Sequence, residues 1–258
     1  MHSYYSDGVL SPGQLVKKFK EEGYDVIALT DHDGIEGVKE FLAACEAAGV
    51  QGVSGIEFST SHILDGVNHE IHLLGYHFDP DNEEFKEVCA DLKRRRHERN
   101  VKLIARLNEK GYELDIDDLE SQSKGKYVGK PNIARVLVSR GYFSYPREVF
   151  DKLLETPEIK AIRKEKLPTE EAIKLIAKAG GQAFVAHPAK IKELGERGTE
   201  EFWNNFEKLI KDLKSKGLKG LECIYPAHTE EEEFRFIQLA GKYHLHISSG
   251  TDFHSEDL

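Results

Sequence analysis

Short apolar runs that end in carboxylates or imidazoles recur along this chain. The clearest is Val26–Leu29, which is followed directly by Thr30-Asp31-His32-Asp33-Gly34. Four apolar residues, two of them β-branched, predict a short buried strand. Burying the carboxylates and the imidazole at its end is costly unless something pairs with them, and a metal ion is a suitable partner.

Five further strands are predicted, most of them next to a carboxylate or an imidazole. They lie at residues 50–56, before Glu57; at 71–76, around His72; at 183–186, before His187; at Gly220–Ile224; and at His246–Ser249, before Asp252 and His254. The carboxyl ends of parallel strands meet at one edge of a sheet. A single site assembled from these strand ends is therefore the simplest explanation of the pattern.

Helical patterns separate these strands. Ser11 as N-cap and Pro12 at the first helical position predict a helix that ends at Gly23. Further helices are predicted at residues 35–48, 169–179, 202–216 and 230–243. The alternation of strands and helices indicates the α/β class.

The middle of the chain has a different pattern. Residues 83–121 carry apolar side chains at helical spacing, among them Leu92, Leu103 and Leu107, and another helix is predicted from Lys130 until Gly141. No strand is predicted from there until residue 181. We therefore predict a main domain formed by residues 1–82 and 166–258, and a helical insertion subdomain formed by residues 83–165.

Composition narrows the classes of function. The 258 residues are 32% charged with a net charge of −10, which argues against broad, charge-driven binding of nucleic acid but leaves room for a small anionic substrate at a metal site. No apolar run approaches the roughly 20 residues that span a bilayer, and no signal segment is recognised, so we expect a cytoplasmic protein without a membrane partner. The scattered Cys45, Cys89 and Cys223 are interpreted as reduced core thiols.

The predicted strand ends and the start of the chain together offer a set of candidate metal-site residues: His2, Asp7, Asp31, His32, Glu57, His72, His187, Asp252 and His254. Imidazole plus carboxylate is the ligand mix of zinc, manganese and iron sites. Asp252 and His254 would share one face of an extended backbone, and Glu57 can bridge two cations through its two oxygens. Closely spaced ions would activate a shared water and neutralise phosphate oxygens.

Each of these residues alone has a simpler interpretation. A single histidine at a strand end is more often hydrogen-bonded in the core or at the surface, Glu57 can cap a turn, and Asp31 can cap the next helix. The recurrence of such residues at equivalent positions favours the metal site. The basic run at residues 94–99 is interpreted as a solvated helix face rather than a binding patch. The remaining histidines are assigned to packing or the surface: His62, His69, His77, His97, His244 and His246.

Several stretches resemble, in the same order, the motifs of the polymerase-and-histidinol-phosphatase (PHP) family of metal-dependent phosphoesterases. They are His2-Ser3, Ser6-Asp7-Gly8, Leu29-Thr30-Asp31-His32-Asp33, Gly55-Ile56-Glu57, His72-Leu73-Leu74-Gly75, Ala186-His187-Pro188, Tyr225-Pro226-Ala227-His228-Thr229 and Ser249-Gly250-Thr251-Asp252-Phe253-His254. The resemblance implies a distorted (β/α)7 TIM-like barrel with a helical insertion. The insertion and residues 130–135 most resemble the small stand-alone members that act on nucleotide phosphates or short RNA ends.

The resemblance also implies a role for each residue around up to three divalent ions (Mn, Fe or Zn). His2 and Asp252 would bind the first ion, with Glu57 bridging to the second; His72 and His187 would complete the second; Asp7, His32 and His254 would hold the third. A metal-bridging hydroxide would attack phosphorus. Asp31 would orient an imidazole, and His228 would assist the leaving group. Lys130 and Arg135 would reach the phosphate from the insertion, and Asn132 lies in the same segment.

The expected activity is hydrolysis of phosphomonoester or phosphodiester bonds in nucleotide-like substrates: 3',5'-bisphosphonucleotides, AMP-like nucleotides or the 5' ends of short RNA. No stable protein partner is expected. One alternative is histidinol-phosphate phosphatase. The other is a catalytically impaired metal-binding module, because the family opens with His-x-His and this chain begins at x, with Met1; we expect the natural gene product to extend further. Lys130-Pro131-Asn132 also replaces the Arg-Pro-His of many related members, which leaves substrate choice open.

Overall fold

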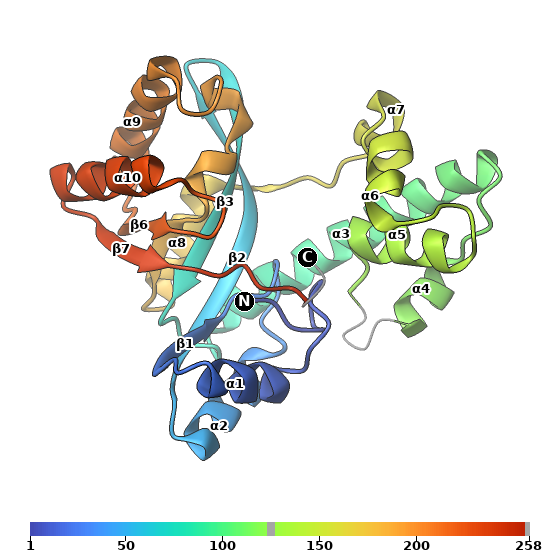
Figure 1. Cartoon of the computed structure of the whole chain (residues 1–258), viewed down its shortest axis with the longest axis horizontal. Coiled ribbons are helices and arrows are strands. Elements are labelled where there is room, and N and C mark those ends of the chain that lie inside the picture. The colour runs from blue at the N-terminus through green and yellow to red at the C-terminus, as the bar shows by residue number, and fades with distance from the viewer. Residues whose placement is uncertain (123–126, 256–258) are drawn as a thin grey trace.

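The computed structural model describes residues 1–122 and 127–255, and within them a seven-stranded, curled sheet forms the centre of the molecule (Figure 1). Six strands lie in the order β1-β2-β3-β5-β6-β7, and the short β4 pairs with β2. The strands are β1 (Val26–Leu29), β2 (Gln51–Leu64), β3 (Val67–Tyr76), β4 (Leu167–Pro168), β5 (Gln182–Val185), β6 (Gly220–Ile224) and β7 (His246–Ser249).

The strands are not all parallel, which corrects the simple picture of a site at parallel strand ends. β1 and β2 are parallel, as are β5, β6 and β7, but β3 is antiparallel to both β2 and β5. β2 and β3 are joined by the turn Asp65-Gly66, in which both residues have positive φ, as in a tight hairpin. The α/β class and the TIM-like curvature are confirmed. No helix lies between β2 and β3, so strands and helices do not alternate strictly at this point. The count of seven β/α units stays a prediction.

Alternation along the hairpin sends apolar and polar side chains to opposite faces of the sheet. On β2, Ile56 and Phe58 are fully buried in the main core, and Glu57 between them points the other way. On β3, Ile71 and Leu73 join the same core and flank His72. Glu57 and His72 therefore lie on the same face, within two strands rather than at their ends.

Five helices cover the outside of the sheet. They are α1 (Pro12–Glu21), α2 (Val38–Ala48), α8 (Thr169–Lys178), α9 (Glu200–Ser215) and α10 (Glu230–Lys242), and the 3-10 turns η2 (Pro188–Lys190) and η3 (Lys192–Leu194) follow β5. Ile176, Phe206 and Phe236 bring α8, α9 and α10 into the main core. The predicted N-cap of α1 is confirmed, since the Ser11 side chain accepts a hydrogen bond from the Gln14 backbone N–H.

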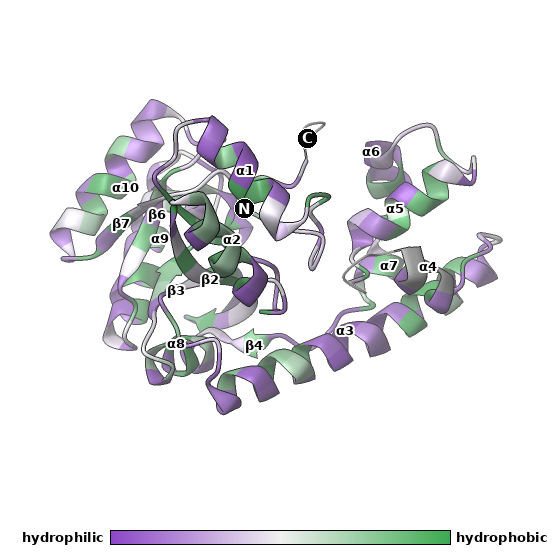
Figure 2. Ribbon diagram, turned by 90° about the horizontal axis from the view of Figure 1, so that it is seen from below, coloured by the Kyte–Doolittle hydropathy of each residue, from purple (hydrophilic) through white to green (hydrophobic). Residues whose placement is uncertain are grey.

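The remaining helices form a second group that stands apart from the sheet (Figures 1 and 2). They are α3 (Glu83–Glu109), α4 (Ile116–Gln122), α5 (Lys130–Ser139), α6 (Pro146–Val149), the π-helical η1 (Phe150–Leu154) and α7 (Pro157–Lys160). Leu92 near the start of α3 belongs to the main core, whereas Leu103 and Leu107 belong to a separate core with the later helices. This separate core supports the predicted subdomain of residues 83–165, whose boundaries stay a prediction.

Two further expectations from the sequence can be compared with the structure. Cys45, Cys89 and Cys223 are all buried and free, as predicted. In the described part of the chain, no helix is both long enough and apolar enough to cross a membrane.

Gly55 is required where β1 and β2 pair beside the polar strand end. A Cβ at this position would lie 2.3 Å from the Leu29 carbonyl oxygen, so Gly55→Ala forces the two strands apart. We expect a loss of about 1–3 kcal/mol in the free energy of unfolding, measured by urea denaturation. Gly13→Ala in α1 is the matched control, because nothing lies within 4 Å of its added Cβ. Its stability should stay level or rise by up to about 1 kcal/mol; equal losses in both variants would contradict the prediction.

Candidate metal centre

All eight residues predicted as metal ligands converge at one end of the sheet. They come from six segments of the described chain: the loop before α1 (His2 and Asp7), the loop after β1 (His32), β2 (Glu57), β3 (His72), the segment after β5 (His187), and the segment after β7 (Asp252 and His254). Within this part of the chain, three groups of side chains have ligand atoms within 4.8 Å of one another: His2, Asp7, His32 and His254; His32, Glu57 and His72; and His2, Glu57 and Asp252.

Glu57 lies at the centre of this cluster. Its Oε1 is 2.7 Å from His72 Nδ1 and 3.0 Å from His187 Nε2, and its Oε2 is 3.1 Å from His2 Nε2. The carboxylate is only 1% exposed. Its two oxygens thus face different imidazoles, which is the arrangement that a bridging carboxylate needs.

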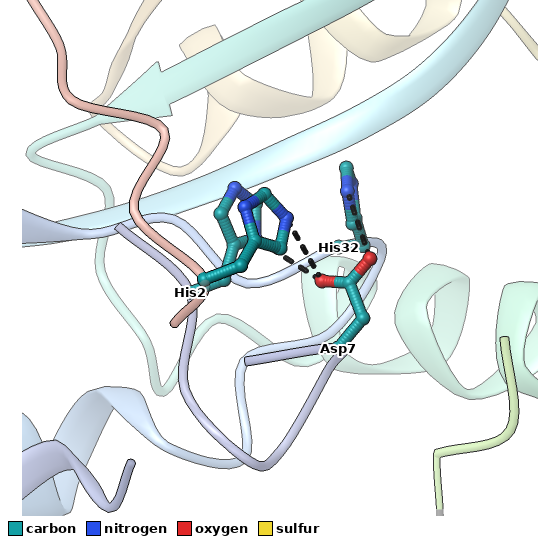
Figure 3. A group of neighbouring side chains, drawn as sticks. His2, Asp7 and His32 are labelled. Carbon is teal, nitrogen blue, oxygen red and sulfur yellow. Dashed lines mark ion pairs between the residues drawn. The ribbon is translucent and has the colours of Figure 1, made fainter. Parts of the chain in front are cut away.

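Asp7 organises the other side of the cluster. Figure 3 shows its carboxylate facing the imidazoles of His2 and His32, at 3.8 and 3.7 Å between the nearest charged atoms. His254 Nε2 lies 3.2 Å from the same carboxylate. Asp7, His32 and His254 form the third predicted ligand set. His2 lies beside this set and also contacts Glu57.

Unsatisfied buried atoms show that this donor set fits a metal. His2 Nδ1, Asp7 Oδ1, His32 Nδ1 and His187 Nδ1 are buried and have no hydrogen-bond partner among the described residues. Buried polar atoms are normally paired, so four such atoms in one cluster call for a ligand. Imidazole and carboxylate donors in this number are suited to Zn, Mn or Fe.

The electrostatics favour the anionic carboxylates that bind cations. Burial would raise the pKa of Glu57, but the charges of His32 and His72 and hydrogen bonds from His187 and His2 outweigh it, so that pKa lies well below its usual range. Burial would likewise lower the pKa of His2, but its hydrogen bonds to Asp252 and Glu57 raise it to about 10. In the metal-free protein, a proton on His2 therefore neutralises part of the negative charge of the cluster. A bound cation would take over this role.

A cavity of about 530 Å³ opens beside this cluster. Asp7, His32, His72 and His187 form one part of its wall. Basic side chains of the insertion and of the segment that returns from it form another part: Arg96, Arg99, Lys130, Lys160, Arg163, Lys164 and Lys166. A metal cluster that faces a basic wall is suited to an anionic substrate such as a phosphate ester.

Comparison with known proteins decides the family. The PHP domain family matches residues 1–224. The chain belongs to this family. It is a metal-dependent phosphoesterase and therefore a hydrolase.

Its relatives include several phosphoesterases of similar length. A 5'-3' exoribonuclease of Haemophilus influenzae is 31% identical over 98% of this chain and 88% of its own length. A 3',5'-nucleoside bisphosphate phosphatase of Chromobacterium violaceum is 28% identical over 98% and 85%. A phosphoribosyl 1,2-cyclic phosphate 1,2-diphosphodiesterase of Eggerthella lenta is 28% identical over 99% and 93%.

Solved structures agree with this assignment. A protein described as a metal-dependent phosphoesterase, from Bifidobacterium adolescentis, superposes with a TM-score of 0.84 at 25% identity, over 100% of this chain and 87% of its own. An amidohydrolase from Chromobacterium violaceum, solved with bound sulfate and no metal, gives 0.84 at 28% identity over 99% and 86%.

Two predictions about supporting residues of this PHP phosphoesterase need correction. Asp31 does not orient an imidazole: it accepts hydrogen bonds from the Ser3 backbone and hydroxyl, both at 2.7 Å, and from the Ser6 hydroxyl at 2.5 Å. Successive side chains of extended backbone point to opposite sides, so Asp31 and His32 face different neighbours. Asp31 instead holds the loop that carries His2 and Asp7.

His228 also lies away from the cavity. Its imidazole pairs with the Cys223 carbonyl oxygen at 3.0 Å, and its ring packs against Phe236. The ring of Tyr225 contacts both His228 and His187, so Tyr225 occupies the position nearer the ligands. A role for His228 in protonating the leaving group therefore finds no support in its position.

Of the three predicted substrate-binding residues, only Lys130 lines the cavity. Asn132 is engaged at the start of α5, where its Oδ1 accepts a hydrogen bond from the Gly129 backbone N–H at 3.0 Å. Arg135 follows on the same helix and is not part of the cavity wall. Because neighbouring side chains on a helix point in different directions, Asn132 and Arg135 do not face the cavity as Lys130 does.

Sequence reasoning missed three residues that hold the ligand segments in place. The Glu222 carboxylate accepts a hydrogen bond from the His187 backbone N–H at 2.6 Å, where His187 has a strained φ of 24°. The Tyr225 hydroxyl donates to Asp252 Oδ2 at 2.8 Å, and Lys190 Nζ lies 3.0 Å from the same oxygen. An acidic residue within the predicted strand Gly220–Ile224 was the one available signal.

Asp33 ties the insertion to the metal centre. Its Oδ2 contacts both Arg96 on α3 and Lys164 on the returning segment, and its Oδ1 accepts a hydrogen bond from the Ser59 backbone N–H at 2.9 Å. Burial would raise the pKa of Asp33, but Lys164 and Arg96 hold it at about 2. A single carboxylate next to His32 thus contacts both the helix that leads into the insertion and the segment that returns from it.

We expect Asp33→Asn to destabilise the metal-free protein by about 3–5 kcal/mol, because it leaves two buried cations without their counter-charge. Urea denaturation in the presence of a chelator measures this change without metal effects. Asp91→Asn is the control, since Asp91 also pairs with two arginines but at the surface. That control should lose about 0–1 kcal/mol. A loss of the same small size in Asp33→Asn would contradict the coupling.

Proposed function

We propose that this PHP phosphoesterase hydrolyses phosphomonoester or phosphodiester bonds of nucleotide-like substrates. The candidates are 3',5'-bisphosphonucleotides, AMP-like nucleotides and the 5' ends of short RNA. The observation that carries the proposal is the buried carboxylate of Glu57, whose oxygens face three imidazoles beside a basic cavity. The names of the relatives, which include a nucleoside bisphosphate phosphatase and an exoribonuclease, favour the same substrate class.

Up to three divalent ions (Mn, Fe or Zn) would be held by these eight residues, in three sets that overlap the observed groups of side chains and add His187, whose Nε2 lies 3.0 Å from Glu57. His2, Asp252 and Glu57 would hold the first, Glu57, His72 and His187 the second, and Asp7, His32 and His254 the third. When bound, the ions supply Lewis acidity, which lowers the pKa of water and offsets the charge of a phosphate. This assignment rests on the distances to Glu57 and Asp7 given above.

The chain's own residues would position substrate and ligands around those ions. Lys130 would contact phosphate oxygens from the insertion side, as a compact cation with three donors. Tyr225 and Lys190 would fix the carboxylate of Asp252, and Asp31 would fix the loop of His2 and Asp7. Holding these groups before the substrate binds reduces reorganisation during the reaction.

The basic wall argues against histidinol phosphate as the substrate. That molecule carries an ammonium group next to its phosphate, and the insertion presents several cations to whatever enters the cavity. Like charges at close range disfavour binding. A panel of histidinol phosphate, adenosine 3',5'-bisphosphate, AMP and 5'-phosphorylated RNA separates these candidates.

The exchange of Glu57 for glutamine tests whether this carboxylate is the bridge. We expect Glu57→Gln to lose the ions that share it and to lower kcat/KM by about a thousandfold or more, since metal-ion stabilisation is worth several kcal/mol. Elemental analysis and hydrolysis of p-nitrophenyl phosphate measure the two effects. Glu40→Gln on α2 is the control and should keep full metal content and turnover. Full turnover in Glu57→Gln would rule out the bridging role, and no turnover in the metal-loaded natural sequence would favour a metal-binding module.

Lys130→Ala tests the predicted contact with substrate. We expect KM for adenosine 3',5'-bisphosphate to rise about tenfold with little change in kcat, because a charged contact made in both the bound and transition states is removed. Metal content should not change. Arg135→Ala, on the same helix but outside the cavity wall, should leave KM unchanged. If Lys130→Ala and Arg135→Ala change KM by the same factor, the predicted contact between Lys130 and the substrate is contradicted.

A further inference from the structure

Glu222 on β6 places one more carboxylate on the inner face of the sheet, beside the predicted ligands. Leu221 and Cys223 are fully buried in the main core, so Glu222 between them points to the opposite face. Glu57 and His72 point to that same face from β2 and β3. Glu222 is 5% exposed, and it belongs to none of the three groups of ligand atoms found in the described part of the chain. A buried carboxylate is costly unless it is paired, so its contacts indicate what it does.

The first contact of Glu222 is with the backbone of a predicted ligand. The His187 backbone N–H donates a hydrogen bond to Glu222 Oε2 at 2.6 Å. His187 has a φ of 24°, a conformation that the surrounding structure must hold in place. A hydrogen bond to a carboxylate is stronger than one to a neutral acceptor, so it is suited to this task. The peptide that it holds directs the His187 imidazole, whose Nε2 lies 3.0 Å from Glu57 Oε1.

The second contact of Glu222 is with the segment that carries Asp252. Gly250 lies so close that a Cβ at this position would be 1.8 Å from Glu222 Oε1. The Gly250 backbone N–H donates to the Ile224 carbonyl oxygen at 3.1 Å, and the pairing of β6 with β7 shifts its register between Glu222 and Ile224. Such irregularities redirect side chains near active sites. Asp252 itself has a positive φ of 47°.

We propose that Glu222 is a positioning residue that holds His187 and Asp252 in place for the first and second ions. The inference rests on the proposed assignment of those ions, in which Asp252 binds the first, His187 binds the second and Glu57 bridges them. Glu222 acts through the backbone of two ligand segments. It contacts neither the substrate nor the ions.

The third predicted ion does not depend on this carboxylate. Its ligands are Asp7, His32 and His254. The His254 carbonyl oxygen accepts a hydrogen bond from the Val9 backbone N–H at 3.0 Å, and Asp31 holds the loop that carries Asp7. The effect of disturbing the β6 carboxylate is therefore selective: two ions bind more weakly and one is retained.

Two substitutions disturb the same contact from opposite sides. Glu222→Ala removes the carboxylate, whereas Gly250→Ala leaves it in the chain and displaces its flexible end with the added Cβ. We expect each to weaken binding of two ions by about 10-fold to 100-fold, the usual effect of removing a group that orients metal ligands. Glu222→Gln keeps an oxygen acceptor for the His187 N–H and should retain most of the affinity. Gly241→Ala is the control, because nothing lies within 4 Å of its added Cβ.

Elemental analysis after dialysis against a series of buffered Mn²⁺ concentrations measures these affinities. The double variant Glu222→Ala with Gly250→Ala shows whether both changes act through one contact. If they do, its affinities match those of Glu222→Ala within about twofold, since residues that act as a unit are not additive. Effects that multiply in the double variant would overturn the coupling of the two segments through Glu222.

The metal-free protein gives a second readout that needs no activity. An amide proton shared with a carboxylate at short distance is strongly deshielded, so the His187 amide proton should move upfield in both Glu222→Ala and Gly250→Ala. Proton NMR of protein labelled with ¹⁵N-histidine measures this shift, and His187→Gln identifies the signal. An unchanged signal in both variants would overturn the contact.

The outcomes separate this inference from the proposed reaction. A natural protein that binds three ions but hydrolyses no phosphate ester contradicts the proposed function alone. One that binds no ion contradicts the assignment of the ions and this inference with it. Normal affinity for every ion in Glu222→Ala and Gly250→Ala, or an equal loss of all three, overturns the positioning role. If Glu222→Ala does not fold, Gly250→Ala and Glu222→Gln carry the same comparison.

Discussion

The buried carboxylate of Glu57 is the constraint on which the rest of this structure depends. It is almost fully shielded from water and contacts imidazoles from the start of the chain, from β3 and from the segment after β5. An isolated carboxylate in such a place would bind a proton instead of staying ionised. Here the imidazoles keep it anionic, and four unsatisfied atoms around it leave room for cations. The fold thus brings together negative charge and unpaired donor atoms that bound metal ions would satisfy.

Much of the site could be predicted from the sequence because its residues follow strands with a clear apolar pattern. The apolar runs Val26–Leu29, before His32, and 50–56, before Glu57, predicted two of these strands, although β2 continues to Leu64 and so carries Glu57 within the strand. The antiparallel placement of β3 could not be predicted in the same way. Strand direction depends on the turn Asp65-Gly66 and on pairing with β5, and an apolar alternation reads the same in either direction.

Contacts between side chains far apart in the sequence were also beyond prediction. The motif around Asp31 suggested a partner among the imidazoles, but the structure gives its oxygens to the hydroxyls of Ser3 and Ser6. His228 follows a strand as several of the predicted ligands do, yet it packs against Phe236. In both cases the residue type and the spacing were informative, and the direction of the side chain was set by packing that no local pattern contains.

The insertion shows how net charge can mislead about function. A net charge of −10 argues against extended, charge-driven binding of nucleic acid, yet lysines and arginines outnumber carboxylates in the wall of the cavity beside the metal centre. Asp33 accounts for this local excess of positive charge. Its carboxylate, beside the predicted ligand His32, contacts Arg96 and Lys164, and Arg99 lies on the same helix as Arg96. Positive charge is thus collected where a phosphate ester would bind, while acidic residues dominate the chain as a whole. On the proposed function, recognition of a phosphate ester would depend on these few cations in the cavity rather than on the net charge of the chain.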